Sequence, residues 1–118
     1  MTKEISCFKA YDVRGRIPSE LNEDVAYRIG AGVASYFRAE SVVVGYDVRP
    51  SSIDILNALT KGINSQDAKV YSIGLCGTEE IYFATNHLNT DAGVMITASH
   101  NPADYNGLKI VGKGAKPV

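Results

Sequence analysis

Two short apolar runs constrain the fold of this chain more than any other feature. Residues 42–44 are three consecutive valines, and residues 92–96 read Ala-Gly-Val-Met-Ile. Apolar runs of this length are typical of strands that are buried on both faces of a sheet. Because parallel strands of this kind are joined by helical crossovers, we expect helices to cover both faces of the sheet.

The segments beside these runs have helical patterns. Val25, Ile29 and Val33 recur every fourth residue, and they predict a helix that begins after an N-cap at Asn22. A second helix is expected to begin after a serine cap and to face inward with four aliphatic residues. The two candidate caps are Ser51 and Ser52, and the four inward residues are Ile53, Leu56, Leu59 and Ile63.

Strands and helices alternate along the rest of the chain. A short helix is expected to begin at an N-cap at Thr78, and further strands are expected at residues 70–73 and 108–111. This alternation predicts an α/β fold with three layers and a mostly parallel central sheet. Gly30-Ala31-Gly32 has the spacing of a dinucleotide-binding motif, but it lies inside a helical stripe and follows no strand. Close packing between helices is the better interpretation of these glycines.

The residues after the second apolar run are the best candidates for chemistry. Ser99 lies just past a strand end, which is where α/β folds place ligands, and His100 and Asn101 add side-chain donors beside it. Asn106-Gly107 is expected to form a turn, after which Lys109 alternates with apolar neighbours on a short strand. The pattern predicts a reactive hydroxyl surrounded by groups that can hold an anion.

This stretch resembles a known sequence. Thr-Ala-Ser-His-Asn-Pro followed by Asp-Tyr-Asn-Gly-Leu-Lys, at residues 97–109, is similar to the phosphoserine loop of the α-D-phosphohexomutases, the phosphomannomutase and phosphoglucomutase family. Residues 11–15 resemble the amino-terminal substrate loop of that family, and residues 77–85 look most like the bacterial phosphomannomutases that make GDP-mannose. The similarity extends over nearly all of the chain.

The resemblance implies roles for particular residues. It implies that Ser99 carries a phosphoryl group and exchanges it with a phosphosugar, so that mannose 6-phosphate and mannose 1-phosphate interconvert through a hexose 1,6-bisphosphate. Arg14, Lys109 and His100 are the other catalytic candidates, since they can move protons or stabilise phosphoryl charge. Tyr11 and Asn101 are expected to bind the substrate.

The resemblance also implies a larger enzyme, of which this chain would be the first domain, built on a mixed four-stranded sheet between helices. Residues 1–111 are expected to form that domain and residues 112–118 to begin an interdomain linker, with domains II–IV absent. Mg²⁺ is expected on the phosphoryl oxygens of Ser99, with its remaining ligands in a missing second domain, because this chain has no Asp-x-Asp-x-Asp sequence. We expect the chain alone to be inactive, and hexose 1,6-bisphosphate to act as activator of the whole enzyme.

Two other polar residues have structural interpretations. Asp47, within Tyr-Asp-Val-Arg at residues 46–49, is expected to support the serine loop, because the family often has a similar sequence there. His87 is expected to interact with the carbonyl groups at the end of the third helix. Neither residue is assigned a catalytic role.

Composition excludes several other classes of protein. Twelve basic residues stand against thirteen acidic ones, so the chain lacks the positive field that nucleic-acid binding normally needs. Cys7 and Cys76 fit no metal-ligand spacing and are expected to be buried free thiols. No apolar run approaches the length of a membrane span, and the amino terminus has no apolar signal core. We therefore expect a cytoplasmic protein with no membrane partner.

Alternative functions differ in how well the residues fit them. Residues 107–114 come within one residue of a P-loop, but Gly114 replaces the hydroxyl residue that would hold the metal. A serine hydrolase is disfavoured because no Gly-x-Ser-x-Gly elbow surrounds Ser99. A non-catalytic module that binds phosphosugars or another protein stays open, as does glucose in place of mannose as the substrate.

Overall fold

The computed structural model describes residues 8–9, 12–17, 19, 21–47, 51–75, 78–97, 105–112 and 116–117. Its helices are α1 (Glu23–Tyr36), α2 (Ser52–Asn64) and α3 (Thr78–His87). Its strands are β1 (Phe8–Lys9), β2 (Asp12–Arg16), β3 (Ser41–Tyr46), β4 (Lys69–Leu75), β5 (Ala92–Ile96), β6 (Tyr105–Gly112) and β7 (Lys116–Pro117). No helix in the described part of the chain is long and apolar enough to cross a bilayer.

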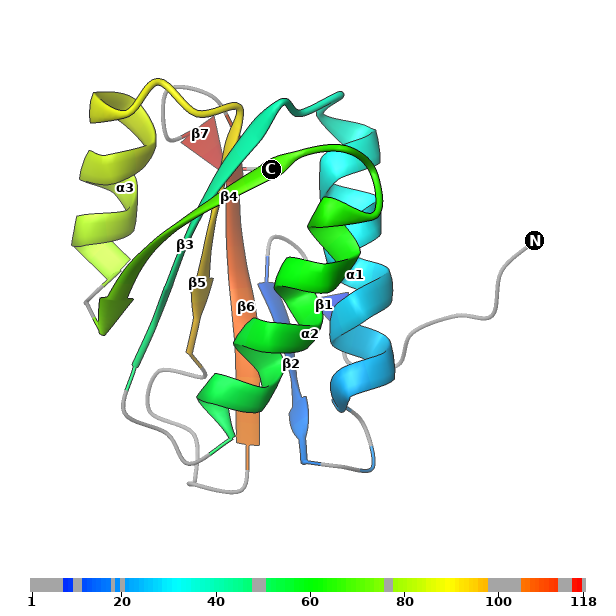
Figure 1. The fold of residues 1–118 in the computed structure, drawn as a ribbon. Coiled ribbons are helices and arrows are strands. Elements are labelled where there is room, and N and C mark those ends of the chain that lie inside the picture. The colour runs from blue at the N-terminus through cyan, green and yellow to red at the C-terminus, as the bar shows by residue number, and fades with distance from the viewer. Residues whose placement is uncertain are drawn as a thin grey trace.

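One mixed sheet runs through the centre of the molecule (Figure 1). Its strand order is β1-β2-β6-β5-β3-β4, and β7 pairs with β6. Strand β3 pairs in parallel with β4 and with β5, and the other pairings described are antiparallel. The predicted α/β fold with a mixed sheet is confirmed, although the parallel part is confined to β4, β3 and β5.

The predicted number of four strands was wrong. Five strands of at least five residues form the sheet among the described residues, together with the two-residue strands β1 and β7. The additional long strand is β2, whose segment was expected to be a loop. All five residues of β2 pair with β6, from Asp12 opposite Lys109 to Arg16 opposite Tyr105. The strand β7 lies in the segment expected to begin a linker, and it pairs with Val111 and Gly112 of β6.

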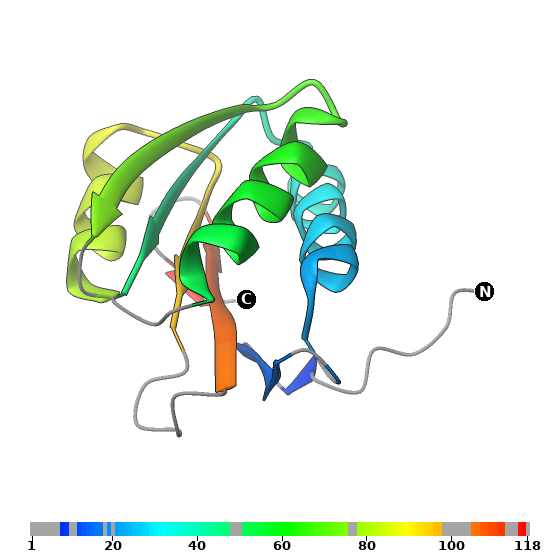
Figure 2. The same ribbon diagram turned by 60° about the horizontal axis from the view of Figure 1, so that its bottom comes forward.

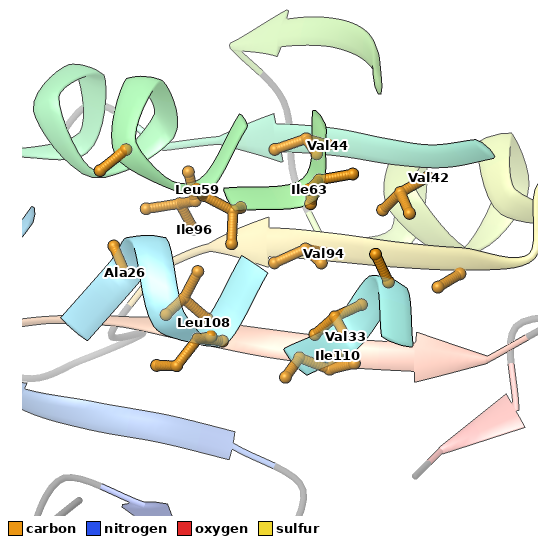
Figure 3. Packing of buried hydrophobic residues seen from close by; sticks show 14 of the residues in the cluster. Ala26, Val33, Val42, Val44, Leu59, Ile63, Val94, Ile96, Leu108 and Ile110 are labelled. Carbon is orange, nitrogen blue, oxygen red and sulfur yellow. The ribbon is translucent and has the colours of Figure 1, made fainter. Parts of the chain in front are cut away.

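The three predicted layers are present. Helices α1 and α2 lie together on one side of the sheet and α3 lies on the other (Figures 1 and 2). Strand β5 is buried along its whole length and alternates between the two layers. Val94 and Ile96 belong to the apolar core under α1 and α2 (Figure 3), whereas Met95 packs in a second cluster with Ile81 of α3. The sheet is therefore covered on both faces, as the apolar runs indicated.

Helix α1 begins where the sequence predicts. The Asn22 side-chain Oδ1 accepts a hydrogen bond from the backbone N–H of Val25 at 3.0 Å, and the N-cap has extended backbone angles. Val25, Ile29 and Val33 are all buried against the core. The predicted cap and the predicted stripe are both confirmed.

The inward face of α2 differs from the prediction at its first turn. Ile53 is 46% exposed, whereas Ile55 is buried, together with Leu59 and Ile63 further along the helix. Leu56 is half-buried and packs at the edge of the core. Two apolar stripes share Leu59 and Ile63, and the one that contains Ile55 faces the sheet. The prediction that Ile53 faces inward was wrong.

Helices α1 and α2 approach each other closely at two glycines. A Cβ atom added to Gly30 would collide with the carbonyl oxygen of Leu59, and a Cβ atom added to Gly62 would collide with that of Tyr27. Only glycine fits where two backbones come this close, because it has no Cβ atom. Close helix packing, the interpretation preferred for residues 30–32, is confirmed at Gly30.

Replacing Asn22 with alanine is expected to lower the free energy of unfolding by about 1 kcal/mol, because the first turn of α1 would lose its side-chain acceptor. Urea unfolding of the two proteins measures the difference. Asn22→Ser keeps an acceptor at the same position and should cost less than Asn22→Ala. Equal losses in the two variants would contradict the role of the cap.

Candidate functional site

The segment that contains Ser99 leaves and re-enters the sheet between neighbouring strands. Strand β5 ends at Ile96, and β6 begins at Tyr105. At the base of this connection, the backbone N–H of Thr97 donates to the carbonyl oxygen of Gly107 at 2.9 Å. The backbone N–H of Asp47, just after β3, donates to the carbonyl oxygen of Ile96 at 3.1 Å. The base of the connection is therefore fixed to both neighbouring strands.

Several of the predicted site residues lie outside the described residues. Ser99, His100 and Asn101 belong to the connection between β5 and β6, and Tyr11 precedes β2. The cysteines Cys7 and Cys76 are also outside the described part of the chain. The structure therefore places the strand ends from which the serine segment starts, and the predicted roles of these four site residues stay predictions.

Two predicted cations occupy adjacent strands beside this connection. Arg14 of β2 is the backbone partner of Gly107, and Lys109 of β6 is the partner of Asp12 on one side and of Met95 on the other. Arg14 and Lys109 are thus diagonal neighbours across one antiparallel ladder. Lys109 is half-buried. The register brings together two positions that are far apart in the sequence.

A buried amide lies at the same end of the sheet. Asn106 is 0% exposed, and its Nδ2 donates to Ser51 Oγ at 2.8 Å and to Ser52 Oγ at 3.1 Å. Its Oδ1 accepts from the backbone N–H of Gly107 at 2.9 Å. The prediction of a turn at Asn106-Gly107 was wrong, because both residues belong to β6 and pair with β2. The amide binds the start of α2 instead of closing a turn.

The hydrogen bonds continue from this amide to the end of β3. Ser52, which is 1% exposed, donates from its Oγ to Asp47 Oδ1 at 3.1 Å. Ser51 is the N-cap residue of α2, but its side chain makes no capping hydrogen bond to the helix. Its hydroxyl accepts from Asn106 instead. Asp47, which was expected to support the serine loop, is therefore linked to the start of β6 through Ser52.

Sequence reasoning did not identify Ser51, Ser52 and Asn106 as members of one polar cluster. Their separation of more than fifty residues hides the contact, since each residue also has an ordinary local interpretation as a cap or a turn. One signal was available, because an asparagine at the start of an otherwise apolar strand must find hydrogen-bond partners if it is buried.

The described residues do not form a metal site by themselves. No three His, Cys, Asp or Glu side chains gather among them in a way that could hold an ion. His87 lies in the last turn of α3, as expected, and its ring stacks on Phe83 with 5.2 Å between ring centroids. The described carboxylates and imidazole therefore do not fit a complete Mg²⁺ site.

Comparison with known proteins gives one consistent result. The family model described as "Phosphoglucomutase/phosphomannomutase, alpha/beta/alpha domain I" matches residues 6–118. A curated phosphomannomutase of Salmonella typhimurium is 54% identical over 118 residues, which are 100% of this chain and 26% of the relative. A phosphomannomutase of Escherichia coli K12 is 51% identical over 98% of this chain and 25% of its own length.

The solved structures agree with the curated relatives. The crystal structure of a phosphoglucomutase/phosphomannomutase family protein from Burkholderia thailandensis matches with a TM-score of 0.87 and 36% sequence identity. The match covers 96% of this chain and 27% of that one. The chain thus spans about a quarter of the length of each of these three proteins.

Proposed function

Because this chain belongs to the phosphoglucomutase/phosphomannomutase family, whose α/β/α domain I it contains, we propose that it supplies the catalytic serine of a phosphohexomutase. The substrates that we propose are mannose 6-phosphate and mannose 1-phosphate, in keeping with the names of the curated relatives. The single observation that carries the proposal is the match to domain I over a segment that includes the whole serine motif.

The proposed reaction transfers one phosphoryl group from Ser99 to the sugar and then one from the sugar to Ser99. The phosphoryl group of phosphorylated Ser99 is transferred to the free hydroxyl of the sugar phosphate. The P–O bond to Ser99 breaks, a bond to the sugar oxygen forms, and that hydroxyl loses its proton. The Ser99 oxygen then accepts the phosphoryl group from the other end of the hexose 1,6-bisphosphate, and a proton returns to the sugar oxygen that is left. At the end Ser99 is phosphorylated again, and the phosphate of the sugar has changed position.

Transfer of this kind needs positioning and positive charge more than covalent assistance. The register that makes Arg14 and Lys109 diagonal neighbours supports a shared role in holding phosphoryl oxygens. We assign proton transfer to Lys109 or His100, and contacts with the sugar to Tyr11 and Asn101. These assignments rest on the matched motifs in the sequence.

Mg²⁺ would bind the phosphoryl oxygens of Ser99, where it would neutralise charge, since Mg²⁺ prefers phosphate and carboxylate oxygens. Its protein ligands would come from the remainder of the protein, because the described residues do not gather a set of ligands. For the same reason, we propose that the domain is inactive in the absence of the other three quarters of the enzyme.

The proposal predicts that Ser99 becomes phosphorylated. The full-length protein that carries this chain is incubated with glucose 1,6-bisphosphate, and its peptides are analysed by mass spectrometry. The Ser99 peptide is expected to gain the mass of one phosphoryl group, and Ser99→Ala is expected to remove that gain. Ser65, an exposed serine after α2, provides the matched control, because Ser65→Ala should leave the labelling unchanged. A protein that binds phosphosugars but gains no phosphate on Ser99 would instead be a binding module.

A further inference from the structure

We propose that Asn106 is a positioning residue for the serine segment. Through Ser51, Ser52 and Asp47, its side chain holds the strand ends on either side of that segment in one arrangement, which sets the rate of phosphoryl transfer at Ser99. This inference rests on the proposed function and adds to it a set of buried residues that do not touch the substrate.

The orientation of the Asn106 amide follows from its partners. The backbone N–H of Gly107 can only donate, so the atom that it contacts must be Oδ1. Both hydrogens of Nδ2 then go to hydroxyl oxygens, one on Ser51 and one on Ser52. The two donors and the oxygen of this fully buried side chain are therefore all in use. A buried amide with this many partners has one favourable orientation.

The hydrogen bonds run in one direction to the end of β3. Because Ser52 Oγ accepts from Asn106, its own hydrogen is available for the donation to Asp47 Oδ1. An acceptor that is ionised strengthens such a bond, and successive bonds polarise each other. Removing the Ser52 hydroxyl would break the connection in the middle and leave a buried Nδ2 hydrogen without that partner.

The residues joined by these hydrogen bonds adjoin both ends of the serine segment, the connection between β5 and β6. Asp47 also donates its backbone N–H to Ile96, the last residue of β5, and Thr97 is bonded to Gly107. On the other side, Asn106 pairs with Gly15, next to the pairing of Arg14 with Gly107. A displacement of Asn106 would thus move the segment's attachment to β6 and the positions of both cations. Displacements of about 1 Å can lower a rate by about 10²-fold when reacting groups must be aligned.

The test uses the full-length protein and a substitution that is mild for folding. Ser52→Ala removes one buried hydroxyl at the serine end of the sheet. The matched control is Thr90→Val, at the opposite end of β5, where a residue that is 0% exposed donates from its Oγ1 to the carbonyl oxygen of Ala92 at 3.1 Å. Each change removes one buried hydroxyl and its hydrogen bonds, so both should lower the melting temperature.

The two variants are expected to differ in rate. Ser52→Ala should slow the appearance of phosphate on Ser99 and lower kcat by about 10- to 100-fold, with the KM for mannose 1-phosphate unchanged within about twofold. Thr90→Val should keep the wild-type labelling rate and kcat. Asn106→Asp, which replaces the donor by a carboxylate of the same shape, should slow labelling at least as much as Ser52→Ala.

Two results would overturn the inference. Wild-type labelling and kcat in Ser52→Ala would show that these hydrogen bonds do not position the serine segment. Equal slowing in Thr90→Val would show that any loss of stability is enough to slow phosphoryl transfer. Failure of the proposed function gives a different result, because the wild-type protein itself would then gain no phosphate on Ser99.

Discussion

Replacing Ser99 with alanine in the full-length protein is expected to lower mutase turnover by about 10⁶-fold, the order of loss seen when an enzyme nucleophile is removed. Without the hydroxyl there is no oxygen to carry the phosphoryl group between the two ends of the sugar. A coupled assay that converts mannose 1-phosphate to mannose 6-phosphate measures the change. The same assay with glucose 1-phosphate tells which hexose the enzyme prefers.

Two controls make the result specific to the hydroxyl. Ser65→Ala removes an exposed hydroxyl that donates to the carbonyl oxygen of Gly62, far along the chain from the serine motif, and should leave turnover at the wild-type rate. The affinity of Ser99→Ala for mannose 1-phosphate, measured by calorimetry, should stay within about tenfold of the wild-type value, since most binding contacts are unaffected. Turnover in Ser99→Ala at the original speed would contradict the proposed reaction.

The parts of the fold that follow from local pattern could be predicted from the sequence. The spacing of Val25, Ile29 and Val33 is a property of a single helix, and Asn22 caps it through a residue three positions away. The apolar run of β5 needs only to be buried on both faces, as it is. Neither inference depends on where distant segments lie.

The parts that depend on distant pairing could not be predicted in the same way. Strand β2 contains Asp12, Arg14 and Arg16, and its sequence gives little sign of a strand until it pairs with β6. In α2, the stripe that begins at Ile53 is as regular as the one that begins at Ile55, and only the position of the sheet decides between them.

The same limit applies to the candidate site. Ser99 and Lys109 stand close together in one motif, so the local sequence was enough to predict a role for each of them. The link from Asn106 to Ser51 and Ser52 joins segments more than fifty residues apart. No residue pattern within either segment predicts that contact. Likewise, only the register of β6 with β2 places Arg14 opposite Gly107, next to Asn106. The residues predicted to carry the chemistry are therefore close together in the sequence, whereas the residues that support the ends of their segment are not.

Replacing Gly62 with alanine is expected to lower the free energy of unfolding by about 2 kcal/mol, the middle of the range for overpacking a core. The added Cβ would lie too close to the carbonyl oxygen of Tyr27 in α1, and a second contact falls on the backbone of Ala31. Because both neighbours are backbone atoms, no side chain can rotate away, and the two helices must separate. The better helix propensity of alanine offsets only up to about 1 kcal/mol of this cost.

Gly32 provides a matched control for this effect. It lies in α1 like Gly30, but a Cβ atom added to it would have no heavy atom within 4 Å. Gly32→Ala is therefore expected to raise the free energy of unfolding by about 0.5 to 1 kcal/mol, through the helix propensity alone. Urea unfolding of the two variants should thus shift in opposite directions from the wild-type midpoint. If Gly62→Ala were as stable as Gly32→Ala, the close contact between α1 and α2 would not limit the residue at position 62.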